Sequence, residues 1–362
     1  MKLPIDLKAV IEAATDIESA RSTPVSVSVL IDDSAPGDVA AHVRSAFVGA
    51  GAHARVTVGY FVGPAFSPYE GDDMAVIVAG FSEEVGRRAA EIRAAGVPVM
   101  IVTSMPRLVA DMASAYGNPI PEGDLVAPEG VEGCEADGDA ARESGDVAGA
   151  NAQSPEILDA PIPIDAAAAA ALDCRMGEWV VAACREKRLA LALSFPFVRR
   201  PLSLEAVSAT SLQNAGIGLV LFIPGADMPL MTLNQAKMLL QIAAAYGEPM
   251  SAARAKELAA IVGGAFACRS VARQVAGAVP AIGWAVKAGV GYAGTKAMGL
   301  AAVEYFERGG NIAGLAGVVS AATAKATQIA GDVAATPAGA RVFSTVKTAV
   351  RQGAASVLKK TE

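Results

Sequence analysis

Histidine, cysteine and aromatic side chains are scarce in this chain of 362 residues. There are two histidines and four cysteines, and only 5% of the residues are aromatic. Neither His42 nor His53 adjoins a serine or cysteine nucleophile motif, so the sequence gives no support for a catalytic triad. The cysteines form no C-x-x-C pair and show no zinc-type spacing, which predicts neither a disulfide framework nor a metal site: Cys134, Cys174, Cys184 and Cys268.

An uninterrupted transmembrane run is also missing, although the mean hydropathy is high at +0.40. A spanning helix needs roughly 20 largely apolar residues. Between residues 216 and 308 the apolar runs are broken by charged side chains, namely Asp227, Lys237, Arg269, Arg273, Lys287 and Lys296. The N-terminus lacks a basic segment followed by an apolar one, so we expect no secretory signal and a reducing, cytoplasmic setting.

Charge is distributed unevenly along the chain. Residues 1–117 carry 9 basic and 14 acidic side chains, residues 118–165 carry 1 and 12, and residues 166–362 carry 20 and 11. A positively charged, apolar C-terminal half suits the anionic cytoplasmic face of a membrane. The basic residues are scattered and no aromatic platform accompanies them, so nucleic acid is not an expected partner.

Strand and helix patterns alternate over residues 1–117. An amphipathic helix is expected at residues 5–20, and further helices at 38–49, 83–95 and 106–116. The strand patterns lie at residues 25–31, 54–61, 74–79 and 97–103. This order predicts an α/β three-layer domain with a mostly parallel sheet, whose ligands would bind beyond the carboxyl ends of the strands.

The first strand end does not carry a phosphate-binding loop. A P-loop requires G-x-x-x-x-G-K-[ST], in which the lysine and the hydroxyl contact the phosphates and magnesium. In register, only Gly37 matches, Asp38 takes the place of the lysine, and Val39 takes the place of the hydroxyl residue. GTP hydrolysis, and enzymatic activity in general, is therefore not expected, and no cofactor is predicted.

Asp32 and Asp33 follow the same strand and admit three interpretations. They can form a turn that caps the next helix, or a weak ion site. They also resemble the paired acidic magnesium site of response-regulator receiver domains. A receiver needs a further aspartate after its third strand, where this chain has Val78-Ala79-Gly80, and a lysine after the 97–103 strand, which is absent.

Residues 118–165 are acidic and rich in Gly, Ala, Pro and Ser. Such a composition buries too little apolar surface to offset its ordering entropy, which predicts a disordered linker. An alternative is an acidic tether that folds back onto the basic C-terminal half.

Residues 166–310 predict an all-α hydrophobic helical domain. A first helix is expected at 166–193, and Ile223-Pro224-Gly225 and Val279-Pro280 separate the following helices. The domain either buries its apolar faces internally or enters one leaflet of a membrane. Small residues recur at every fourth position and form one ridge, which would allow close helix packing or a homo-oligomer: Ala281, Ala285, Gly289, Ala293, Ala297 and Ala301.

The last segment, residues 311–362, is Ala/Gly-rich and ends in a basic amphipathic helix that includes Arg351 and Lys359. Such a helix is typical of membrane-surface or partner docking, or it closes over the bundle.

The C-terminal half resembles a known family. The I-P-G-A-D pattern at residues 223–227, Gln235 and Met238 before Tyr246-Gly247, and the glycine-rich stretch from residue 278 to 309 are similar to the YcjF-type membrane-associated domain of unknown function, over about residues 170–310. In bacteria that domain also occurs at the C-termini of some Era-like small GTPases. Residues 72–79 and 96–102 resemble strands of an Era-like G domain, although the N-K-x-D motif position, residues 103–106, reads T-S-M-P.

The resemblance implies a noncatalytic adaptor or regulatory protein at the cytoplasmic face of the cell membrane, with a pseudo-GTPase-like domain. Its partners would be membrane lipid, an active GTPase or a second copy of the chain. The alternatives are a phosphosignalling or metal-dependent domain that uses Asp32 and Asp33, and a soluble oligomeric scaffold. The candidate membrane or partner contacts are Pro224, Asp227, Gln235, Trp284, Lys287, Gly289, Arg351 and Lys359.

Overall fold

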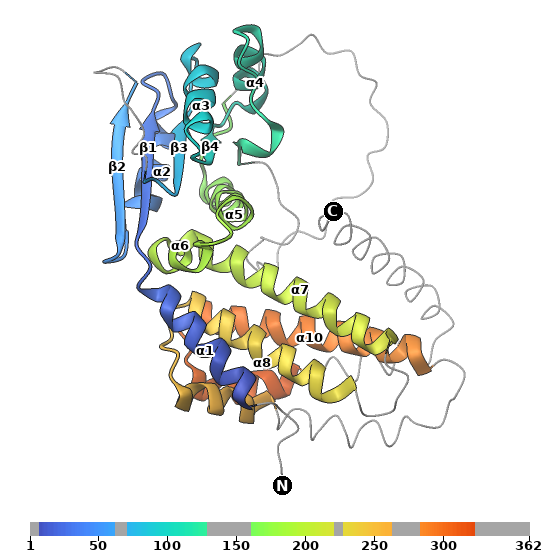
Figure 1. Cartoon of the computed structure of the whole chain (residues 1–362). Coiled ribbons are helices and arrows are strands. Elements are labelled where there is room, and N and C mark those ends of the chain that lie inside the picture. The colour runs from blue at the N-terminus through green and yellow to red at the C-terminus, as the bar shows by residue number, and fades with distance from the viewer. Residues whose placement is uncertain (1–6, 62–70, 129–160, 221–226, 263–282, 323–362) are drawn as a thin grey trace. The chain divides into compact units, whose positions relative to one another are not determined.

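The structure, a computed structural model, falls into two compact units (Figure 1). One unit comprises Met1–Arg21 and Leu202–Glu362, and we call it the helical unit; the other comprises Ser22–Pro201, and we call it the sheet unit. The described residues are 7–61, 71–128, 161–220, 227–262 and 283–322. These boundaries differ from the expected domains, because the first helix joins the helical unit and residues 166–201 join the sheet unit.

The sheet unit contains a parallel five-stranded sheet in the order β2-β1-β3-β4-β5. Its strands are β1 (Val25–Ile31), β2 (Ala54–Tyr60), β3 (Met74–Val78), β4 (Val99–Val102) and β5 (Leu125–Val126). The expected parallel α/β sheet is confirmed. The order 2-1-3-4-5 is that of flavodoxin and of receiver domains, and its topological switch point lies between β1 and β3.

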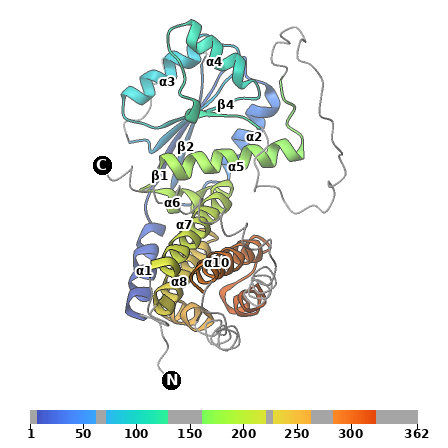
Figure 2. The ribbon, with the colours of Figure 1, turned by 90° about the vertical axis from the view of Figure 1, so that its right-hand side faces the viewer.

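Helices cover both faces of the sheet. The crossover from β1 to β2 contains α2 (Gly37–Val48), and the crossover from β3 to β4, which runs the opposite way, contains α3 (Glu84–Ala94). Because such crossovers are right-handed, α2 and α3 lie on opposite faces. Figure 2 shows α3 beside α4 (Pro106–Ala115), and these two helices pack over Leu30, Ile77 and Ile101.

Residues 166–201 belong to the sheet unit because they pack against the sheet and α2. Helix α5 (Ala166–Ala183) packs against β4 and β5. After it, Phe195 and Phe197 place their rings 4.9 and 5.2 Å from the ring of Phe47 in α2. These contacts attach α6 (Arg188–Ser194) and the short helix η2 (Pro196–Val198) to the sheet.

The single helix expected at residues 166–193 is two helices. Helix α5 ends at Ala183, and the chain leaves helical geometry at Cys184 before α6 begins at Arg188. In this break the Lys187 ammonium contacts Asp73 Oδ1 at 2.7 Å and the Pro24 carbonyl at 3.0 Å. These contacts fix the position of the break next to the sheet. The sequence did not predict the break, because such contacts do not change the helical periodicity of the apolar residues.

The linker expected at residues 118–165 contains structure at both ends. Helix η1 (Glu122–Asp124) leads into β5, whose Leu125 pairs with Ile101 of β4. A two-residue strand is too short to show alternation, which is why the sequence did not predict it. Residues 161–165 are also described, whereas the expectation for residues 129–160 lies outside the described residues.

The helical unit is organised around a buried helix. Its elements are α1 (Leu7–Arg21), α7 (Arg199–Val220), α8 (Asp227–Ala245), α10 (Gly283–Glu307), η3 (Ile312–Gly314) and helical stretches at 252–262 and 315–322. Residues 238–240 and 242–245 of α8 are fully buried, and Gln241 between them is exposed, so the second half of this helix buries most of its circumference. Helix α8 contacts α1 and α10. Across the described ranges, no helix combines the length and apolar character that crossing a membrane requires.

Helix α1 is held in this unit by its own polar contacts. Arg21 donates hydrogen bonds from Nη1 to the carbonyls of Gly247 and Glu248, at 3.1 and 2.7 Å. Glu18 accepts the Met250 N–H at 2.9 Å. The expected assignment of this helix to the N-terminal domain is therefore wrong, because its partners lie more than 220 residues further along the chain.

In residues 292–307 of α10, where burial is described, the buried face is not the predicted small-residue ridge. Of that ridge, Ala293 is exposed and Ala297 and Ala301 are half-buried. The close contact uses Gly299 instead, where an added Cβ would lie 2.4 Å from Cγ2 of Val207 in α7. A homo-oligomer through the ridge stays a prediction.

Candidate functional site

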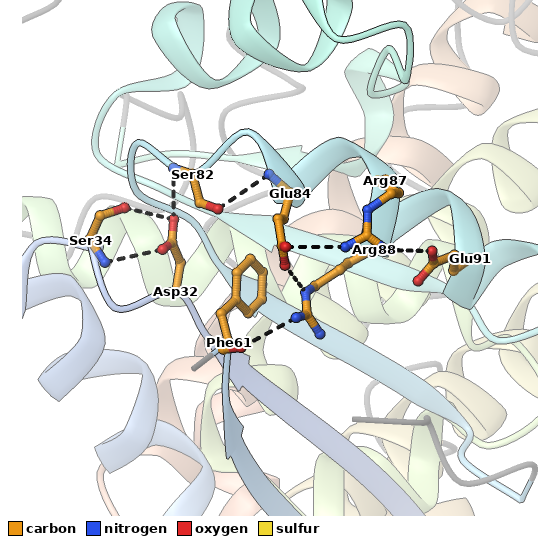
Figure 3. A network of polar contacts seen from close by, with 8 residues as sticks. All are labelled: Asp32, Ser34, Phe61, Ser82, Glu84, Arg87, Arg88 and Glu91. Carbon is orange, nitrogen blue, oxygen red and sulfur yellow. Dashed lines mark hydrogen bonds and ion pairs between the residues drawn. The ribbon is translucent and has the colours of Figure 1, made fainter. Parts of the chain in front are cut away.

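Asp32 lies at the carboxyl end of β1, at the switch point of the sheet, and is 3% exposed. Its Oδ1 accepts the Ser34 N–H at 3.1 Å, which makes an Asx turn. Its Oδ2 accepts the Ser34 hydroxyl at 2.9 Å, the Gly80 N–H at 2.9 Å and the Ser82 N–H at 3.2 Å. Figure 3 shows Asp32 between Ser34 and Ser82. We call these four residues the latch.

The latch occupies the hydrogen-bonding capacity of the Asp32 carboxylate. Four donors match the roughly four acceptor positions that an ionised carboxylate offers. Asp33 is exposed, so the two carboxylates do not form one buried site. In the part of the chain that the structure describes, no group of three or more His, Cys, Asp or Glu side chains could hold a metal ion. The turn is therefore the role that the geometry gives to Asp32.

The backbone closes the same place sterically. A Cβ added to Gly80 would lie 2.3 Å from the Ser34 carbonyl carbon. Only glycine therefore permits the loop after β3 to touch the loop after β1. Ligands of doubly wound sheets bind at this switch point, and here the two loops contact each other.

Arg88 fixes the start of α3 to the end of β2 (Figure 3). Its Nε lies 2.8 Å from Glu84 Oε2, and its guanidinium carbon lies 4.5 Å from the centroid of the Phe61 ring. The hydrogen bond from Arg88 is the main cause of the lowered pKa of Glu84. The charge of Arg88 is therefore paired within the chain.

A segment from the end of the expected linker makes two hydrogen bonds near this edge of the sheet. We call residues 161–165 the strap. The Ile162 N–H donates to the Ser104 carbonyl after β4 at 3.1 Å, and the Ile164 N–H donates to Asp38 Oδ2 at 3.2 Å. The other oxygen of Asp38 accepts the Val39 N–H at 2.9 Å. Asp38, the residue in the P-loop lysine position, therefore binds the chain's own backbone.

Another aspartate, Asp72, binds side chains near the amino end of β1. Asp72 accepts the hydroxyls of Ser26 and Ser28 at 2.6 and 2.5 Å, because the alternation of β1 places both serines on one face. The thiol of Cys184 is buried, and burial is the main cause that raises its pKa to about 12. A thiol with so high a pKa is not an activated nucleophile.

His42 has a partner that the sequence did not reveal. The residue is half-buried on α2, and its Nε2 lies 2.8 Å from Asp173 Oδ1 of α5. The hydrogen bond to Asp173 is the main cause that raises the pKa of His42. No local pattern identifies the pair, since its members are 131 residues apart.

Gln235 lies in the core, which corrects its prediction as a membrane or partner contact. The residue is 1% exposed, and its Nε2 donates to Thr295 Oγ1 at 2.9 Å. The same oxygen accepts from Asn214 Nδ2 at 3.0 Å, and Asn214 Oδ1 accepts from Asn234 Nδ2 at 3.0 Å. We call these four residues the core polar network. The only sequence signal for it was polar side chains on helix faces that are otherwise apolar.

The other predicted contact residues lie at the starts of two helices or outside the described residues. Asp227 is the first residue of α8. Trp284, Lys287 and Gly289 lie in the first half of α10. The remaining candidates, Pro224, Arg351 and Lys359, lie outside the described residues.

Comparison with known proteins identifies no relative. The chain matches no protein-family model, and neither a curated protein nor a solved structure is significantly similar to it. The fold and the site define a parallel α/β sheet of flavodoxin-like strand order joined to a helical unit. The resemblance to the YcjF-type domain and to a G domain remains a prediction.

Proposed function

We propose that this protein is a noncatalytic adaptor whose helical unit docks on the anionic cytoplasmic face of a membrane. The observation that carries the proposal is the latch. The one buried carboxylate at the switch point accepts four hydrogen bonds from its own loops, where an enzyme of this fold would hold its ligand. The sheet unit then acts as a three-layer interaction domain, in the manner of a pseudo-GTPase, with an active GTPase as one candidate partner.

Charge supports the membrane half of the proposal. The helical unit carries 17 basic and 12 acidic side chains, whereas the sheet unit carries 13 and 25. Each basic residue near an anionic surface contributes about 1 kcal/mol. Residues 238–240 and 242–245 of α8 are buried inside the unit, which favours docking on the headgroups over insertion.

Vesicle sedimentation tests this proposal. The full chain should pellet with vesicles that contain phosphatidylserine and stay in the supernatant with phosphatidylcholine alone. High salt should release it, because screening weakens attraction between charges. Binding that ignores lipid charge and salt would contradict electrostatic docking, and no binding at all would favour the soluble oligomeric scaffold.

A phosphosignalling or metal-dependent domain is the second candidate, because the strand order is that of receiver domains. It predicts a magnesium-dependent rise in melting temperature that disappears in the chain carrying Asp32→Ala and Asp33→Ala. Our proposal predicts that magnesium leaves the melting temperature of both chains unchanged.

A further inference from the structure

The strap has the pattern Pro161-Ile162-Pro163-Ile164 before Asp165, whose side chain accepts the Ala168 N–H at the start of α5. The prolines have no N–H and keep the segment extended. Residues 161–164 therefore offer only two N–H groups, those of Ile162 and Ile164. Both are hydrogen-bonded to the sheet unit, at Ser104 and Asp38.

The side chains of the strap alternate in the same way as its N–H groups. Ile162 and Ile164 are half-buried, while Pro161, Pro163 and Asp165 are exposed. Each isoleucine therefore contributes one backbone hydrogen bond and one inward aliphatic side chain. Extended peptides are recognised by this combination, in which the backbone supplies affinity and alternate side chains supply specificity.

One group beside the strap is not satisfied by it. Ser104 is 1% exposed, and its hydroxyl has no hydrogen-bond partner among the described residues, although its carbonyl accepts the Ile162 N–H. A buried hydroxyl without a partner is unfavourable and rare. The strap therefore leaves one polar group of this edge without a partner among the described residues.

We propose that the carboxyl ends of β1 and β4 form a peptide-binding site, which the strap occupies in the resting protein. The partner is an extended segment with aliphatic side chains at alternate positions and an N–H at each of them. It is uncharged or basic, because Asp33 and Asp38 are exposed at this edge. The inference rests on the proposed adaptor function and gives it a partner class.

The strap competes with such a partner for the same site. It has an advantage over a free peptide because it belongs to the same chain. Tethered segments act at effective concentrations that reach the millimolar range. A free peptide of similar affinity therefore binds only when the strap is weakened or displaced.

The test uses full-length chains and an uncharged fluorescent peptide, A-A-P-I-P-I-A-A, which has the sequence of residues 159–166 with both aspartates replaced by alanine. The chain with Ile162→Asp and Ile164→Asp loses the inward side chains and places new charges near Asp38. It should bind the peptide saturably, at least about tenfold more tightly than the unmodified chain. The matched control is Ala166→Asp with Ala167→Asp, which adds two charges at exposed positions after the strap, keeps both isoleucines and both prolines, and should bind like the unmodified chain.

Two results would overturn the proposal. One is that the chain with Ile162→Asp and Ile164→Asp melts like the unmodified protein but binds no peptide. The other is that this variant and the unmodified chain bind the peptide equally, which would mean that the peptide binds at a site other than that of the strap. An N-methylated peptide, lacking the N–H groups of both isoleucines, should fail to compete.

Amide hydrogen exchange on the unmodified chain tests the proposal without a substitution. The amides of Ile162 and Ile164 should exchange faster than those in the centre of α5, because the strap opens while α5 stays folded. Equal protection would mean that the strap leaves only on global unfolding and would contradict a displaceable strap. Both experiments contain no lipid, so they fail or succeed independently of membrane docking.

Discussion

At the scale of the single residue, the carboxylates near the strand ends act as acceptors for the chain's own donors. Asp32 ties two loops at the carboxyl ends of β1 and β3, and Asp72 holds two serines at the amino end of β1. Hydrogen bonds to charged groups stabilise proteins by about 1.5–3 kcal/mol each, and leaving their donors buried and unpaired is expensive. These acidic residues are therefore expected to control stability.

Asp32→Asn should lower the free energy of unfolding by about 2–3 kcal/mol, because the amide group turns a donor toward N–H groups that need an acceptor. Urea unfolding of the full chain measures the change. The control is Asp111→Asn at an exposed position of α4, where a change within about 0.5 kcal/mol is expected. Equal effects at the two positions would mean that the latch does not hold the loops.

His42 should make stability depend on pH. The hydrogen bond to Asp173 raises the pKa of His42 above its usual 6.5. A raised folded-state pKa means that the stabilisation is fully present below about 6.5 and is lost as the pH rises through the folded pKa. Asp173 is 40% exposed, so solvent screening keeps the effect small.

Melting temperatures across this pH range check the prediction. The part of the decline caused by His42 should vanish in Asp173→Asn and persist in His53→Gln, which alters the exposed second histidine. A pH profile that is the same in the unmodified chain and in Asp173→Asn would exclude this role for the pair.

At the scale of the element, α10 contacts α7 at two places, the hydroxyl of Thr295 and the glycine at position 299. Thr295 Oγ1 accepts hydrogen bonds from Asn214 and Gln235 at 3.0 and 2.9 Å. Thr295→Val conserves shape but leaves two buried amide groups short of an acceptor, and should reduce stability by about 2 kcal/mol. Thr295→Ser keeps the hydroxyl and should recover much of the loss in urea unfolding; a valine variant as stable as the serine variant would count against the core polar network.

Gly299→Ala tests the close approach of the two helices. The added methyl group would meet Val207 at 2.4 Å, so we expect a loss of about 1–3 kcal/mol from overpacking. Gly294→Ala in the same helix meets nothing within 4 Å and should be neutral or stabilise by up to about 1 kcal/mol. Adding Val207→Ala should relieve part of the Gly299→Ala loss in thermal unfolding, and no relief would contradict the packing.

The elements that the sequence predicted correctly are those with a local signal. Strand β1 reads V-S-V-S-V-L-I and is bounded by turn residues, and β3 is a short apolar run. Strand β5 has two residues and no period, and the break after Ala183 depends on contacts made by Lys187. Local patterns contain no information on such tertiary choices.

The candidate site was predictable to the same extent. A turn that caps the next helix was one of three interpretations of D-D-S after the first strand. Ser34 makes the turn with Asp32, but the N-cap of α2 is Pro36 and has no side-chain hydrogen bond. The donors from the loop after β3 lie 48 and 50 residues further on, at Gly80 and Ser82. The strap was part of an expected linker because proline and acidic residues dominate its sequence, although its two isoleucines supply the hydrogen bonds that hold it.

At the scale of the whole molecule, the chain separates two kinds of surface. The sheet unit is acidic and its loops contact each other at the switch point, whereas the helical unit has a basic excess and buries most of the second half of α8. This division assigns partner binding to the sheet unit and lipid contact to the helical unit in the proposed adaptor.

The most direct measurement is fractionation of bacterial cells that express the full chain, with the membrane pellet washed first in high salt and then in alkaline carbonate. Peripheral docking predicts that the protein pellets with membranes and that salt alone releases it, because screening removes the attraction of basic side chains to anionic lipid. Retention through both washes would contradict docking on the headgroups and favour insertion. A chain that never pellets would contradict the membrane-adaptor account itself.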